Sequence, residues 1–181
     1  MTSRAAVESI DRARFEALML PHMDAAYTLA RYWTRNEQDA EDIVQDAYLR
    51  ALRYFDGYRG ESPASARAWL LTIVRNTAYT TRKRGRVDAL ITEFDDTEHS
   101  LAAIDDQPAG VEVRHDAKET LGRALDRLAP EFREVIVLRE LQGLSYKEIG
   151  EVTGGPVGTV MSRLSRARAR LQEALREKGE R

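Results

Sequence analysis

Hydrogen-bond donors recur along one face of the last amphipathic stretch of the sequence, residues 156–171. Hydroxyl and guanidinium groups follow one another there at mostly helical spacing: Thr159, Ser162, Arg163, Arg166 and Arg170. Guanidinium groups donate paired hydrogen bonds to guanine edges and phosphates, and hydroxyl groups contact the backbone of a nucleic acid. A second face is apolar: Val157, Val160, Leu164, Ala167 and Leu171. The pattern predicts a helix that is buried on one side and can lie in a DNA major groove on the other.

The residues just before this helix are of the types that would position it. Ser145 and Glu148 have the spacing of a capping box at the start of a short helix. Gly154 and Gly155 permit the left-handed backbone of a sharp turn, and Pro156 suits the first position of the next helix. Together they predict a helix-turn-helix, although an ordinary amphipathic hairpin with a solvated arginine face would give a similar pattern.

Charge is distributed unevenly along the 181 residues, although the net charge is only −2. Residues 88–119 contain ten acids and two bases, whereas residues 157–176 contain five arginines and one acid, which suits partners of opposite sign. The chain has no cysteine and three scattered histidines, so we expect no metal and no cofactor. It has no apolar run of membrane-spanning length and no signal-peptide core, which predicts a soluble cytoplasmic protein.

The first half of the chain reads as helices without strand signals, predicted over residues 1–20, 23–34, 39–55 and 63–84. The third helix is the most amphipathic, and we expect seven of its residues to face inward: Ile43, Val44, Ala47, Tyr48, Ala51, Leu52 and Phe55. Between the third and fourth helices, Tyr58 is expected to be exposed in a glycine-containing loop, and Ser62 and Pro63 to begin the fourth helix. These helices predict a first domain over residues 8–86.

Residues 87–117 are acidic and weakly periodic, which predicts a flexible or extended linker. A second domain is predicted over residues 118–176. Its first helices are expected to bury these apolar residues before Gly143 ends them: Leu121, Leu125, Leu128, Phe132, Val135, Ile136, Leu138 and Leu141. The predicted fold class is therefore all-α, with two small helical domains joined by an acidic linker and the helix-turn-helix at the end of the second.

Three stretches, in this order, resemble the extracytoplasmic-function group of bacterial sigma factors. They read DAEDIVQDAYLRALRYF at 39–55, FDGYRGESPASARAWLLTIVRNTAYTTRKR at 55–84 and LDRLAPEFREVIVLRELQGLSYKEIGEVTGGPVGTVMSRLSRARARL at 125–171. The resemblance covers most of the chain outside the N-terminus and the acidic linker. It implies a non-enzymatic subunit that binds core RNA polymerase and directs it to promoters of a stress or envelope-signal regulon.

In this family, the helix that matches residues 39–55 docks on a coiled coil of the largest polymerase subunit. The resemblance therefore implies polymerase contacts by Asp42, Gln45 and Asp46, with an apolar contact from Leu52. Acids on a rigid helix pair with arginines of a partner and orient it more than they add affinity. A plain solvated face is the alternative for these acids. The resemblance also implies contact with the polymerase flap and sequestration by an anti-sigma factor.

The loop at 56–62 and the helix after it match the family's reader of the promoter element near the start site, where a base is trapped outside the stack. The implied loop contacts are Tyr58, Arg59 and Ser62. Along the helix, Asn76 is expected at a base edge and Tyr79 as a further contact, whereas Trp69 is expected in the core. Phosphate contacts are expected from Arg75, Arg82, Lys83 and Arg84. Thr80 stands where the family often has an acid, which leaves the base preference open.

The last helix matches the family's reader of the upstream promoter element. The resemblance implies that Arg163 and Arg166 contact bases or lie near them, and that Thr159 and Ser162 lie close to the DNA backbone. Phosphate contacts are expected from Lys147, Arg168 and Arg170. Met161 stands where many relatives have a basic residue, so one contact is expected to be absent.

Two other functions fit parts of the sequence. A stand-alone helix-turn-helix regulator would bind duplex DNA tightly without polymerase. A protein that binds only partner helices would show no salt-dependent DNA affinity, whereas phosphate contacts impose a steep dependence. No phosphate-binding glycine loop, paired nucleophile and base, or metal-ligand cluster is found in the sequence, so we expect no catalytic residues.

Overall fold

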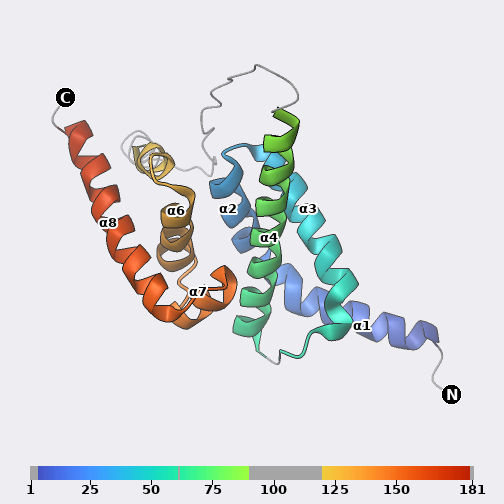
Figure 1. Cartoon of the computed structure of the whole chain (residues 1–181). Coiled ribbons are helices and arrows are strands. Elements are labelled where there is room, and N and C mark those ends of the chain that lie inside the picture. Colours follow the sequence, from blue (N-terminus) through green and yellow to red (C-terminus); the bar gives the residue numbers. More distant parts are fainter. Residues whose placement is uncertain (1–3, 61, 90–119, 180–181) are drawn as a thin grey trace, which may run out of the picture. The chain divides into compact units, whose positions relative to one another are not determined.

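A computed structural model describes residues 4–60, 62–89 and 120–179, and within these ranges the side chains of residues 12–82 and 120–176. The described residues form helices and turns and contain no strand, which confirms the all-α class. They divide into two compact units, the first made of the helices up to α4 and the second of most residues from 120 onward (Figure 1). Nearly all of the predicted acidic linker, 87–117, lies outside the described residues.

The first unit is a group of helices of unequal length. They are α1 (Arg4–Met19), the short 3₁₀ helix η1 (Leu20–His22), α2 (Met23–Thr34), α3 (Glu37–Tyr54), the 3₁₀ helix η2 (Phe55–Gly57) and α4 (Pro63–Ala89). Helices α2, α3 and α4 pack against one another, and α1 contacts α4 (Figure 1). Their shared core contains the fully buried side chains of Met19, Leu29, Leu70, Leu71 and Val74. Helix α4 continues beyond the predicted end of the first domain at residue 86.

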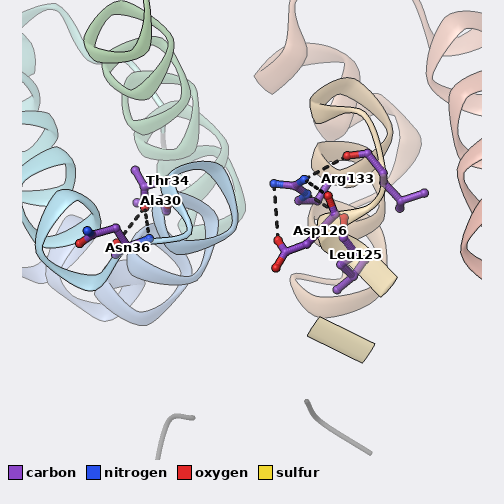
Figure 2. A network of polar contacts seen from close by, with 7 residues as sticks. Ala30, Thr34, Asn36, Leu125, Asp126 and Arg133 are labelled. Carbon is purple, nitrogen blue, oxygen red and sulfur yellow. Dashed lines mark hydrogen bonds and ion pairs between the residues drawn. The ribbon is translucent and has the colours of Figure 1, made fainter. Parts of the chain in front are cut away.

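Local hydrogen bonds set the ends of these helices. Asn36 is the N-cap of α3, and its side chain accepts a hydrogen bond from the Asp39 amide at 3.2 Å. Thr34 donates to the carbonyl oxygens of Ala30 and Asn36 at 3.1 and 2.9 Å, which ties the end of α2 to the start of α3 (Figure 2). Farther along, the Tyr48 hydroxyl donates to the Met19 carbonyl at 2.8 Å and joins α3 to the end of α1.

One predicted inward residue of α3 is exposed. Ala40, Ile43, Ala47 and Ala51 are buried at a spacing of three and four, whereas Leu52 remains 50% exposed. Consecutive helical residues point about 100° apart, so a core centred on these four residues leaves Leu52 outside its edge. The prediction that Leu52 faces the core is therefore wrong.

The second unit contains a helix over residues 120–126, α6 (Pro130–Ile136), the π-helical turn η3 (Val137–Leu141), α7 (Tyr146–Thr153) and α8 (Val157–Gly179). Helices α6 and α8 pack against each other (Figure 1). The buried side chains of this unit include Leu125, Val135, Leu138, Leu144, Ile149 and Leu164.

A buried arginine holds the end of the first of these helices. Arg133 is 5% exposed, and its guanidinium donates to the carbonyl oxygens of Leu125 at 2.9 Å, Asp126 at 2.8 Å and Leu128 at 3.0 Å (Figure 2). The third guanidinium nitrogen, Nη1, lies 3.8 Å from the Asp126 carboxylate. The last carbonyls of a helix lack amide donors within the helix, and the side chain of Arg133 in α6 supplies hydrogen-bond donors to them.

The π-helical turn closes with backbone hydrogen bonds that span five and six residues, wider than the four-residue spacing of an α-helix. The amide of Gln142 donates to the Val137 carbonyl at 3.0 Å, and the amide of Leu144 donates to the Leu138 carbonyl at 3.0 Å. Gly143 ends the turn in the left-handed region, with φ of +65°. The wider turn leaves Leu141 45% exposed, so the prediction that it is buried is wrong.

Candidate nucleic-acid interface

The predicted helix-turn-helix forms from the residues that indicated it. The Ser145 amide donates to the Glu148 carboxylate at 2.7 Å, and the Glu148 amide donates to the Ser145 hydroxyl at 3.2 Å, which is the reciprocal capping box at the start of α7. Ile149 and Val152 of this helix are buried, and Tyr146 is partly buried.

The turn after α7 needs one left-handed residue rather than the two that the sequence suggested. Gly154 has φ of +68°, whereas Gly155 does not adopt a positive φ. The Gly155 amide donates to the Gly150 carbonyl at 3.0 Å, and a Cβ atom on Gly150 would lie 2.9 Å from the Gly155 carbonyl oxygen. Pro156 precedes the helix, and its carbonyl oxygen accepts hydrogen bonds from the Thr159 and Val160 amides. Helix α8 therefore begins one residue later than predicted.

Helix α8 is buried on the face that the sequence predicted. Val160, Leu164 and Ala167 are at most 1% exposed, and Leu171 is partly buried. Val157, in the first turn, is 42% exposed and does not join this stripe.

The donors of α8 differ in what surrounds them. Arg166 is exposed and Arg163 partly buried, and neither forms a hydrogen bond or ion pair with another residue of the described part of the chain. Ser162 donates from its hydroxyl to the Thr159 carbonyl at 3.0 Å. Lys147 is exposed in the first turn of α7, and Met161 is 52% exposed.

Two of the predicted phosphate contacts have partners within the protein. The Arg168 guanidinium donates to one oxygen of Glu140 at 2.6 and 3.1 Å. The guanidinium of Arg170 lies over the ring of Phe132, 4.5 Å from its centroid. The four arginines of α8 that were predicted to contact DNA therefore fall into two groups, with Arg163 and Arg166 available toward the N-terminal half and Arg168 and Arg170 engaged farther along.

The loop between η2 and α4 contradicts one expectation. The sequence predicts an exposed Tyr58, but this residue is only 4% exposed, because its ring stacks on Phe55 with centroids 5.8 Å apart and lies 5.0 Å from the Trp69 ring. Its hydroxyl is 3.0 Å from the Ser65 hydroxyl. A base cannot stack on this ring in the described arrangement, so Tyr58 shapes the loop from within. Trp69, predicted to lie in the core, is partly buried, with its ring 6.5 Å from that of Phe55 and 5.0 Å from that of Tyr58.

Two other loop residues lie at its surface. Arg59 is exposed and donates to the carbonyl oxygen of Asp56. Ser62 is the cap of α4, since its hydroxyl accepts from the Ser65 amide at 3.1 Å. The predicted N-terminal capping of α4 is thus confirmed, and it leaves the Ser62 hydroxyl engaged in the cap.

The outer face of α4 carries the remaining predicted contacts of this unit. Asn76 and Arg82 are exposed, Tyr79 is 59% exposed, and Arg75 is partly buried. The Thr80 hydroxyl donates to the Asn76 carbonyl at 2.7 Å, so it bonds to its own helix. The side chains of Lys83 and Arg84 lie outside the described residues.

The outer face of α3 combines acids with exposed leucines. Asp42 and Asp46 are exposed, as the resemblance implied, and Gln45 is exposed as well. Leu49 is 57% exposed and lies on the same face as these residues and Leu52. Sequence analysis missed Leu49, although its spacing of seven from Asp42 and four from Gln45 places it on the polar stripe.

Comparison with known proteins assigns both halves of the chain. Residues 18–87 match the family described as Sigma-70 region 2, and residues 118–171 match Sigma-70, region 4. The ECF RNA polymerase sigma factor SigE of Mycolicibacterium smegmatis is 36% identical over 89% of this chain, which spans 61% of that relative. The RNA polymerase sigma-H factor of Pseudomonas aeruginosa is 32% identical over 93% of this chain and 90% of its own length.

Solved structures agree in fold. The sigma factor RpoE of Bartonella quintana, crystallised with the anti-sigma factor NepR, gives a TM-score of 0.75 at 32% identity and covers 90% of this chain and 97% of its own. CnrH in complex with the cytosolic domain of CnrY gives a TM-score of 0.65 at 28% identity and covers 96% of this chain and 94% of its own. A helical region 2 and a region 4 with a helix-turn-helix define an RNA polymerase sigma factor, a regulatory and non-catalytic class. Within it, the chain belongs to the extracytoplasmic-function sigma factors, which act in transcription initiation.

Within the described residues, no helix combines the length and the apolar character needed to cross a bilayer.

Proposed function

We propose that this chain binds core RNA polymerase through the outer face of α3. The observation that carries the proposal is the exposure of Leu49 and Leu52 beside Asp42 and Asp46 on one rigid helix. Exposed leucines in a row with acids suit a partner that offers an apolar seam flanked by arginines, as a coiled coil does. Region 4 would contact the flap of the same polymerase.

Promoter recognition is divided between the two units in this proposal. Arg163 and Arg166 of α8 read the upstream element from the major groove, with Thr159 and Lys147 at its backbone. Asn76, Tyr79 and Arg59 contact the strand that opens near the start site, and Arg75, Arg82, Lys83 and Arg84 hold its phosphates. The chain itself contributes no catalytic residue, cofactor or metal.

The similar structures suggest how this activity is regulated. One similar structure contains a sigma factor together with an anti-sigma factor, and another contains CnrH with the cytosolic domain of CnrY. We propose that a comparable protein sequesters this chain in the cytoplasm until a stress or envelope signal releases it. The ten acids of residues 88–119 would follow polymerase channels that otherwise hold nucleic acid, because they mimic its charge.

Run-off transcription tests the proposal directly. The full chain is added to bacterial core polymerase on a randomised promoter library, and we expect discrete start sites that share an upstream and a near-start element. The same chain with Asp42→Arg and Asp46→Arg should fail to bind core polymerase while its fold is retained. Tight, specific binding of the chain alone to duplex DNA, without promoter-dependent transcription, would instead favour a stand-alone regulator.

A further inference from the structure

A cluster of four polar side chains, here called the Glu140 cluster, joins η3, α7 and α8. It consists of Arg139, Glu140, Tyr146 and Arg168. Two nitrogens of Arg168 donate to one carboxylate oxygen of Glu140, at 2.6 and 3.1 Å, across 28 residues of sequence. The pKa of Arg168 is raised, chiefly by this hydrogen bond, and the neighbouring Tyr146 hydroxyl raises it further. Arg168 therefore bonds to η3 and is influenced electrostatically by α7.

The other arginine of the cluster contacts the ring of Tyr146. The Arg139 guanidinium lies over the Tyr146 ring, 4.9 Å from the centroid. It also donates to the Leu144 carbonyl at 2.7 Å, in the segment that leads from η3 into α7. Tyr146 is thus held between one arginine on its face and another near its hydroxyl, and both arginines are anchored to η3 or to the residues next to it.

The position of Arg168 on α8 separates it from the DNA-facing arginines. At about 100° per residue, Arg168 points roughly 200° away from Arg166, whereas Arg163 and Arg166 lie within about 60° of each other. Arg168 lies beside the buried stripe, on the side toward η3. Its side chain is about half exposed, but its direction and its partner Glu140 both lie away from the face that would enter the groove.

We propose that Arg168 is a positioning residue of region 4, which sets the angle of the recognition helix through Glu140 and Tyr146, and that it makes no phosphate contact. This inference rests on the proposed role of α8 in reading the upstream element, and it replaces the sequence-based assignment of Arg168 to phosphate. A helix in the major groove must keep its side chains within narrow angular limits of the base edges that they contact. A side-chain clamp that is shared by three elements therefore affects affinity without touching DNA.

The salt dependence of binding separates a clamp from a phosphate contact. Holoenzyme, formed from the full chain and core polymerase, is titrated by fluorescence anisotropy against a labelled duplex that carries the upstream element, over a series of salt concentrations. Each phosphate contact contributes about 0.9 to the slope of log affinity against log salt. Arg166→Gln should lower that slope by about this amount if Arg166 also lies near a phosphate, or weaken binding selectively at one base pair if it reads a base.

For Arg168→Gln and Glu140→Gln, we expect affinity to fall about two- to fivefold at low salt, the ratio that an exposed ion pair's usual contribution converts to, and less at high salt because salt screens such a pair. The salt slope should change by much less than about 0.9 for both. The exchanged pair, Glu140→Arg with Arg168→Glu, should recover most of the lost affinity, which a general loss of stability would not produce. Thermal unfolding of each variant confirms that the holoenzyme contains folded chain.

Three results would overturn the clamp. One is a slope that falls by about 0.9 in Arg168→Gln, because that is the signature of a lost phosphate contact. Another is a gain in affinity for Glu140→Gln, which would mean that the carboxylate competes with DNA for Arg168. The third is failure of the exchanged pair to recover. If the wild-type holoenzyme shows no selective binding to any upstream element, the proposed function of α8 fails as well, and the two failures are thereby distinguished.

Discussion

The hydroxyl groups of Tyr58 and Ser65 lie 3.0 Å apart and tie the loop after η2 to the first turn of α4. The same Ser65 hydroxyl donates to the Ser62 carbonyl at 2.8 Å, so the tyrosine is connected to the helix cap. The conformation of this loop, which borders the proposed near-start contacts, is therefore set by an aromatic residue that it encloses.

The space around Tyr58 makes position 60 sensitive to a single methyl group. A Cβ atom on Gly60 would lie 2.1 Å from the Tyr58 hydroxyl oxygen and 2.6 Å from the Ser65 hydroxyl, so Gly60→Ala must displace the loop. We expect a loss of about 1–3 kcal/mol in unfolding free energy and a weaker opening of promoter DNA. Urea denaturation and permanganate footprinting measure the two effects. Gly57→Ala is the matched control, because a methyl group there would have nothing within 4 Å, and equal effects of the two substitutions would contradict the prediction.

Arg133 is expected to be essential to the stability of the second unit. Arg133→Met removes the guanidinium donors of three helix-end carbonyls, of which the Leu125 carbonyl keeps the Leu128 amide, and we expect a cost of about 2–4 kcal/mol. Arg133→Lys should recover only part of this loss, since one ammonium cannot reach all three oxygens. Chemical denaturation followed by circular dichroism measures both, with the exposed Arg176→Met as a control that should change stability by less than about 0.5 kcal/mol. A fully stable Arg133→Met protein would exclude the capping role.

Leu49 and Leu52 are expected to act in binding rather than in folding. Because both are at least half exposed, Leu49→Ala and Leu52→Ala should leave unfolding free energy within about 0.5 kcal/mol of the wild type. Affinity for core polymerase should fall about fivefold or more for each, as expected of an apolar contact near the centre of an interface. Biolayer interferometry with immobilised core enzyme gives the affinities. Leu20→Ala, at 45% exposure in η1, is the control, and a comparable loss there would remove the specificity of the prediction.

Arg163 is expected to read a base of the upstream element. Arg163→Ala should cost about 1–3 kcal/mol in holoenzyme affinity for the cognate element and should relax preference at one base pair. Competition with duplexes mutated one base pair at a time measures this. A loss that is uniform across all sequences would reassign Arg163 to the phosphate backbone.

His22 is expected to make stability depend on pH. Burial, and then the positive charge of Arg67, lower the pKa of His22 in the folded protein, although a backbone hydrogen bond with Pro63 opposes this. The unfolded chain takes up a proton near the ordinary pKa of about 6.5, while the folded protein resists it, so the unfolded state binds more protons as pH falls. This contribution to stability is present above that value and is lost as pH falls through and below it. Urea unfolding from pH 7.5 to 5.5 should show a smaller decline for His22→Gln, and identical declines would contradict the assignment.

Features set by neighbouring residues were predictable from the sequence. The capping box of Ser145 and Glu148, the cap at Ser62 and the buried stripe of α8 all follow from spacings of three and four residues, and the structure contains each of them. Because helix ends and amphipathic faces depend on short-range geometry, one sequence is sufficient to infer them.

Features that depend on distant partners were not predictable. Tyr58 lies between glycines, as surface residues often do, but Trp69 encloses it from the next helix. The pairing of Glu140 with Arg168 joins residues 28 positions apart, and no local pattern announces it. Leu49 could have been found, because a leucine on an otherwise acidic stripe is the signal of a contact surface.

The π-helical turn of η3 implies that the chain retains one residue more than an ordinary helix of the same reach would need. Because the extra residue is taken up within the wider turn, deleting one residue from 137–141 would let the backbone return to α-helical pitch while the segments on either side keep nearly the same orientation. The side chains inside the turn would be redistributed, however, and the guanidinium of Arg139 and the carboxylate of Glu140 would not both keep their present directions. A shortened variant would therefore keep its helices and lose part of the Glu140 cluster, so the length of this segment, and not only its composition, is under constraint.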